Sequence, residues 1–185
     1  IPVDLFRQKA EAAAPLPGSN VPPPPEPAAR QIEQALALLR RAERPVVIAG
    51  SGVWWSGAAA ELQGLVEKAS LPLYTVTLGR GTVSDEHPLC MGYADPALNR
   101  AALQVFQEAD VVLVVGKRLD YRLAFGGPRL FSPEARFIQI DIHPQELGMN
   151  RALEVAICAD AKSALRALHD GWGAAPPPAR PWLEK

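Results

Sequence analysis

Residues 45–52 read PVVIAGSG, a short apolar segment that runs into a glycine turn. Residues 137–144 read FIQIDIHP, a second apolar segment that carries Asp141 near its end. A strand without polar alternation is typical of a parallel sheet that is covered on both faces. A glycine turn directly after such a strand lets the backbone approach a ligand closely. Together the two stretches predict an α/β domain that can bind a nucleotide.

Strands and helices alternate along the rest of the chain. Apolar runs predict strands over 46–49, 71–76, 111–115, 137–142 and 154–158, with a short additional strand at 87–91. Helical spacing predicts helices over 28–43, 57–70 (with Ser56 as its N-cap), 97–108, 144–148 and 161–171. Apolar strands that are each followed by an amphipathic helix predict a parallel sheet between two helical layers. In such folds the ligand crevice lies outside the carboxyl ends of the strands.

Proline-rich segments flank this alternating region. Seven of the sixteen residues 12–27 are proline, and prolines recur at 176–178 and 181. Proline has no N–H donor for a helix or a sheet, so such a run is extended and serves as a spacer, or as a ligand for an SH3 domain. We expect a linker over 1–27, a globular domain over 28–172 and a second linker over 173–185.

Composition narrows the class of protein. The 185 residues include 19 lysines and arginines against 20 acidic residues, without a long basic run, so we expect no nucleic-acid or membrane partner. The apolar stretches have the length of strands, not of membrane spans. Cys90 and Cys158 lie in apolar segments and are expected to be buried, reduced thiols, which fits a cytoplasmic protein. The chain opens with IPVD, without a start methionine, and is therefore interpreted as a fragment.

Three glycine turns follow predicted strands, at 50–52, 77–82 and 116–122. The glycine after Gly52 is Gly57, which is too distant for the G-x-G-x-x-G fingerprint, and the second strand ends in threonines instead of a carboxylate. The ordinary dinucleotide motif is therefore absent, and a plain strand-to-helix turn remains an alternative at Gly50. Arg118 and Arg122 in the third turn suit a phosphate, or equally a surface ion pair.

Other side chains near the predicted crevice are also open to interpretation. Asp141 could accept hydrogen bonds from ribose hydroxyls or cap the turn that follows its strand. Asp160 could cap the last helix. Trp54 and Trp55, placed in a loop, could stack on a base or pack against another domain. The sequence shows neither a Cys/His metal cluster nor a catalytic triad, so we predict no catalytic residue and no metal site.

The ordered combination of RPVVIAGSG (44–52), TLGRG (77–81), GKRLDYR (116–122) and QIDIHPQELGMN (139–150) resembles the central domain of thiamine-diphosphate-dependent enzymes of the acetolactate synthase-like family. The resemblance implies a three-layer, Rossmann-like α/β domain with a six-stranded parallel sheet. It also implies flanking pyrimidine- and pyrophosphate-binding domains, which would hold thiamine diphosphate and Mg in a homodimeric or homotetrameric parent. The fragment alone would not be catalytic, and the central domain would hold FAD, ADP or nothing.

The same resemblance assigns cofactor contacts to eight positions of this chain: Gly50, Gly52, Thr77, Gly79, Arg118, Asp141, Ile142 and Asp160. Lys117 departs from the family pattern, which has a small residue before the arginine. The run LAFG (123–126) is similar to the 2-hydroxyacyl-CoA lyase and oxalyl-CoA decarboxylase branch, some members of which bind ADP. Alternatives are a flavin-binding electron-transfer module, a sirtuin-like deacylase and a purely structural spacer.

Overall fold

The computed structural model describes residues 4, 8–9, 22–174, 176 and 178–184. Most of the predicted linker over 1–27 and parts of the linker over 173–185 therefore lie outside the described residues. Six strands form one sheet in the order β3-β2-β1-β4-β5-β6, and every neighbouring pair is parallel. The strands are β1 (Pro45–Ala49), β2 (Leu73–Thr75), β3 (Cys90–Tyr93), β4 (Val111–Val115), β5 (Arg136–Asp141) and β6 (Val155–Cys158).

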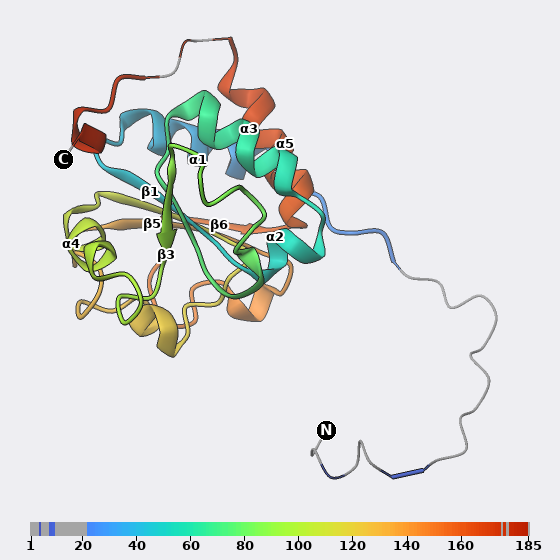
Figure 1. Cartoon of the computed structure of the whole chain (residues 1–185). Helices are drawn as coiled ribbons and strands as arrows, with labels where there is room; N and C mark the ends of the chain where they lie inside the picture. The colour runs from blue at the N-terminus through green and yellow to red at the C-terminus, as the bar shows by residue number, and fades with distance from the viewer. Residues whose placement is uncertain (1–3, 5–7, 10–21, 175, 177, 185) are drawn as a thin grey trace.

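Helices cover both faces of this sheet, which confirms the three-layer Rossmann-like prediction. On one face lie α1 (Ala29–Arg41), α3 (Ala59–Ala69) and α5 (Ala161–Trp172), and α4 (Arg100–Glu108) lies on the other (Figure 1). The apolar sides of α1, α3 and α5 share one buried cluster with alternate residues of the strands, such as Leu113. Stacked rings of Phe106 and Phe131, with centroids 5.2 Å apart, fill the second cluster under α4.

The strand order reverses between β1 and β4. After β1 the chain extends the sheet through β2 to β3, and it then returns to place β4 on the other side of β1. In an open parallel sheet, such a switch point leaves a crevice outside the carboxyl ends of the two strands. The fold therefore positions the loops that follow β1 and β4 next to each other.

Three local predictions were wrong. Residues 51–55, expected as a loop, form a short helix, α2 (Ser51–Trp55), and Ser56 ends it by donating from Oγ to the Gly52 carbonyl at 2.9 Å. Ser56 therefore does not cap the next helix; α3 begins after Ala58 without a side-chain cap. The edge strand is Cys90–Tyr93, because residues 84–90 turn through hydrogen bonds from the amides of His87 and Cys90.

The cysteines are only partly as expected. Neither Cys90 nor Cys158 forms a disulfide within the described residues, but both are half-buried instead of buried. Cys158 lies in the edge strand β6, where alternate residues face outward. No helix in the described part of the chain combines the length and the apolar character needed to cross a membrane.

The segment before the domain and the segment after it contact the domain at opposite edges of the sheet. The Pro25 carbonyl accepts a hydrogen bond from the amide of Asp160 at 2.9 Å, next to the start of α5. Arg180 is buried and donates to the carbonyls of Ala42 and Ala69, at 2.8 and 3.2 Å. Those carbonyls end α1 and α3, just before β1 and β2, and so lie at the amino edge of the sheet.

Candidate functional site

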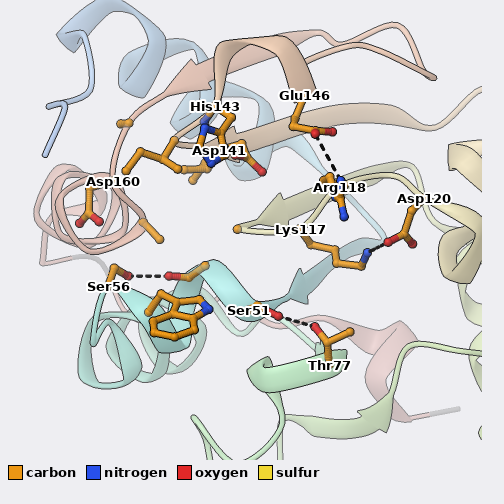
Figure 2. A pocket seen from close by; sticks show the side chains of 17 residues that line it. Ser51, Ser56, Thr77, Lys117, Arg118, Asp120, Asp141, His143, Glu146 and Asp160 are labelled. Atoms are coloured by element: carbon orange, nitrogen blue, oxygen red, sulfur yellow. Dashed lines mark hydrogen bonds and ion pairs between the residues drawn. The ribbon is translucent and has the colours of Figure 1, made fainter. Parts of the chain in front are cut away.

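A cleft of about 700 Å³ lies at the carboxyl edge of the sheet, at the switch point (Figure 2). The loops after five of the six strands supply its walls, and β3 alone contributes nothing. This volume is in the range of small-molecule and cofactor sites. The lining residues are Ser51, Gly52, Trp55, Ser56, Thr77, Gly116, Lys117, Arg118, Asp120, Ile140, Asp141, Ile142, His143, Glu146, Ala159, Asp160 and Ala161.

Backbone packed against backbone forms the floor of the cleft. The amide of Gly52 donates to the carbonyl of Gly116 at 2.9 Å, across the switch point. A Cβ atom at Gly52 would lie 2.5 Å from the Gly116 Cα, closer than real side chains approach. Gly116 itself has a φ of +57°, a conformation that glycine adopts without strain. The two glycines thus bring the β1 and β4 loops together.

Gly50 and Gly79, two of the eight predicted cofactor contacts, do not line the cleft. A Cβ atom at Gly50 would lie 2.6 Å from the Cβ of Lys117, and one at Gly79 would overlap the Ala49 carbonyl oxygen. Both residues are glycine because neighbouring strand-end loops pack against them. The family resemblance assigned them to the cofactor, and in a sequence a glycine required by packing looks the same as one required by a ligand.

The other six predicted residues do lie in the cleft, and two of them belong to its polar end. Arg118 lies 3.6 Å from the Glu146 carboxylate and is largely exposed, so its guanidinium is free to move toward a ligand. Thr77 has a left-handed φ of +56° and shares a 2.8 Å hydroxyl hydrogen bond with Ser51. Arg122 is not part of the cleft; it points toward the Asp95 carboxylate, 3.9 Å away.

Lys117, the departure from the family pattern, is nearly buried in the cleft wall. Its side chain is 6% exposed, and its amine forms an ion pair with Asp120 (Figure 2). Asp120 also accepts a hydrogen bond from the amide of Arg122 at 3.1 Å. A buried lysine needs such a partner because desolvation penalises an unpaired charge. Lys117 and Arg118 therefore place two cations at one end of the cleft, and each is paired with a carboxylate that also lines it, Asp120 or Glu146.

Asp141 is a nearly buried carboxylate, with 8% of the residue exposed. Burial raises its pKa above the ordinary value of 3.8, and the hydrogen bond from the His143 amide opposes that shift. One carboxylate oxygen, Oδ1, accepts that hydrogen bond at 2.9 Å, so the turn-capping interpretation is correct for this oxygen. A hydroxyl donor from a ligand would stabilise the buried charge further.

Asp160 marks the other end of the cleft, where it caps α5 as one interpretation expected. Its Oδ1 accepts from the amides of Lys162 and Ser163, at 2.9 and 3.3 Å. Ile142 is half-exposed on the β5 side of the same cleft. Trp55, the last residue of α2, also lines this part of the cleft.

Several lining residues were not predicted, among them Glu146 and His143. Both belong to the QIDIHPQELGMN stretch (139–150) that carries the family resemblance, but the resemblance assigned no cofactor contact to either of them. Within the described residues no three His, Cys, Asp or Glu side chains come together as a metal site would require.

Comparison with known families decides what kind of domain this is. Residues 32–168 match the family model of the thiamine pyrophosphate enzyme, central domain. The chain belongs to this family. The matched residues extend from α1 into α5 and include all six strands. The sheet and the cleft described above are therefore those of a thiamine pyrophosphate enzyme central domain.

Individual relatives of this central domain are parts of longer enzymes. It is 41% identical over 138 residues to a probable acetolactate synthase large subunit of Methanocaldococcus jannaschii, covering 75% of this chain and 23% of the relative. It is 34% identical over 144 residues to oxalyl-CoA decarboxylase of Escherichia coli, and the aligned region covers 77% of this chain and 24% of the relative. It is 35% identical over 151 residues to mouse 2-hydroxyacyl-CoA lyase 1, and the aligned region covers 80% of this chain and 25% of the relative. The chain thus spans about a quarter of each of these relatives.

Solved structures share the fold of this central domain. Benzoylformate decarboxylase from Polynucleobacter necessarius superposes with a TM-score of 0.68 at 15% identity, covering 91% of this chain and 31% of the other. At that identity the likeness establishes the architecture alone.

Proposed function

We propose that this domain is the centre of an acetolactate synthase-like enzyme, a thiamine-diphosphate-dependent carboligase or decarboxylase of 2-oxo acids, and that its cleft binds an adenine nucleotide, ADP or FAD. The observation that supports the nucleotide site is the cleft at the switch point, with two cations and a buried carboxylate in its walls. The relatives with acetolactate synthase names support the class of the whole protein.

The residues of the cleft fit an adenine nucleotide chemically. Arg118 offers the planar, permanently charged guanidinium that suits a phosphate group. Asp141 offers an acceptor for ribose hydroxyls, since a carboxylate has more acceptor sites than the single His143 amide uses. Gly52 lies at the floor of the cleft, where its close contact with Gly116 joins the loops after β1 and β4.

In this proposal the domain supports the enzyme without carrying out its chemistry. Thiamine diphosphate and Mg would be held by flanking pyrimidine- and pyrophosphate-binding domains, in a homodimer or homotetramer. Thiamine diphosphate stabilises a carbanion derived from its substrate. The residues described here would hold the nucleotide and space the flanking domains. The free Cys90 and Cys158 support a cytoplasmic location.

The nucleotide site is tested by calorimetric titration of the 185-residue chain with ADP, FAD and NAD in parallel. We expect ADP or FAD to bind, and Arg118→Ala to weaken binding about tenfold or more through the loss of a charged phosphate contact. Because Arg118 is largely exposed, the same change should alter the free energy of unfolding by less than about 0.5 kcal/mol. Arg122→Ala, outside the cleft, is the matched control.

Binding of NAD alone, or equal affinity in the Arg118 and Arg122 variants, would contradict the proposed site. The class of the whole protein is tested separately, by assaying the product of the full gene with thiamine diphosphate and Mg. We expect carboligation of 2-oxo acids; cleavage of acyl-CoA substrates alone would instead assign the protein to the branch of the lyase and decarboxylase relatives. Family membership does not favour the electron-transfer alternative.

A further inference from the structure

Two adjacent tryptophans occupy the rim of the cleft, but only one of them lines it. Trp54 is 52% exposed and Trp55 is 73% exposed, and their rings touch edge to face with centroids 4.8 Å apart. Trp55 contributes to the cleft wall, whereas Trp54 does not. A large aromatic side chain exposed beside a cleft usually contacts a ligand or another protein surface. The geometry thus separates two residues that the sequence could not distinguish.

The backbone under Trp55 is held firmly. Val53, in the middle of α2, is fully buried, and its carbonyl accepts a hydrogen bond from the amide of Ala58 at 3.0 Å. The Ser56 hydroxyl donates to the Gly52 carbonyl at 2.9 Å, which ties the end of the helix to its start. The backbone that carries Trp55 is therefore held in place at the rim of the cleft.

The cleft has two ends of different chemistry. Lys117 and Arg118 lie at one end, and Ser56 and Asp160 lie at the other (Figure 2). The apolar lining atoms beyond the cations come from Trp55 and from Ile142, Ala159 and Ala161 on the loops after β5 and β6. A nucleoside diphosphate has the same division, because its phosphates are anionic and its base is a flat ring. Asp141, the last residue of β5, is the acceptor that a ribose would meet.

We propose that Trp55 is the residue that stacks on the base of the bound nucleotide and so selects ligands with a flat ring over bare phosphates. This inference rests on the proposed nucleotide site and assigns its base-binding end. Stacking is insensitive to the identity of the ring, so Trp55 would favour adenine or a flavin over pyrophosphate without reading hydrogen-bonding groups of the base.

The test compares ADP with inorganic pyrophosphate, by calorimetry, on the 185-residue chain and its Trp55→Ala, Trp55→Phe and Trp54→Ala variants. Base stacking on an aromatic side chain predicts a loss of ADP affinity of about five- to a hundredfold in Trp55→Ala. Trp55→Phe should recover most of that loss, and Trp54→Ala should bind ADP like the parent. Pyrophosphate has no ring, so its affinity should be the same in all four proteins.

Each contrary result has a distinct meaning. If the unchanged chain binds ADP and Trp55→Ala binds it equally well, the stacking role is wrong while the nucleotide site stands. Equal weakening in the Trp54 and Trp55 variants would also overturn it, because only Trp55 lines the cleft. If the unchanged chain does not bind ADP or FAD, the proposed function itself fails, and the stacking role fails with it.

Discussion

At the scale of single residues, the cleft contains groups that lower the stability of the domain when no ligand is bound. Asp141 is the clearest case, because burial raises its pKa and no cation lies in direct contact with its carboxylate within the described residues. For an acid with a raised folded-state pKa, the folded state binds more protons than the unfolded chain. The contribution of Asp141 to the free energy of unfolding is then most favourable at low pH, and it falls as the pH rises above about 3.8, the ordinary pKa of this group.

We therefore expect Asp141→Asn to stabilise the domain at pH 7, by about 0.5–2 kcal/mol, while weakening the binding of ADP. The amide oxygen can still accept from the His143 amide, and the buried charge is gone. Thermal unfolding at several pH values measures the effect. The stability difference between variant and parent should shrink as the pH falls and Asp141 becomes protonated. A variant less stable than the parent at pH 7 would show that the carboxylate is needed for the fold.

At the scale of elements, the decisive contact is the one between the turn after β1 and the end of β4. Gly52→Ala should destabilise the domain by about 1–3 kcal/mol, because its Cβ meets the Gly116 Cα at 2.5 Å and backbone cannot easily yield. Gly64→Ala, inside α3, is the control. Its Cβ would meet only the movable ring of His169 at 3.3 Å, and alanine favours a helix, so its stability should stay within about 1 kcal/mol of the parent.

Chemical denaturation of both variants measures these differences. Equal stability in the two would mean that the β1 and β4 loops can separate without cost, and that the cleft floor is not fixed by this contact.

The elements also show how far sequence reasoning reaches. The central strands were predicted because an uninterrupted apolar run such as Val111–Val115 is typical of a strand that is buried on both faces of a parallel sheet. The carboxyl ends of these strands then placed the predicted crevice at one edge of the sheet. The helix α2 was missed because five residues with one glycine and two tryptophans show no helical period. Burial of Lys117 could not be predicted, since it depends on Asp120 folding back onto it. The separate roles of Trp54 and Trp55 depend on the exact end of α2 and were equally inaccessible.

At the scale of the whole molecule, the proline-rich segment after α5 is tied back to the domain. Arg180→Ala should lower stability by about 1–3 kcal/mol, since it removes two hydrogen bonds from a charged, buried donor. It should also speed proteolysis between residues 173 and 180. Arg166→Ala, an exposed α5 residue paired with Glu61, is the control and should cost less than about 1 kcal/mol. Unchanged cleavage in the Arg180 variant would mean that the segment is held by other contacts.

The hydrogen bond from the Asp160 amide to the Pro25 carbonyl joins the incoming chain to a wall of the cleft. The turn at 159–161 therefore has two attachments, one to whatever fills the cleft and one to the polypeptide that arrives from upstream. A filled cleft would hold this turn still and, through it, fix the point from which the upstream polypeptide departs. In the proposed enzyme, an occupant of this cleft would in this way help to set the geometry in which the reaction takes place, although it takes no part in that reaction.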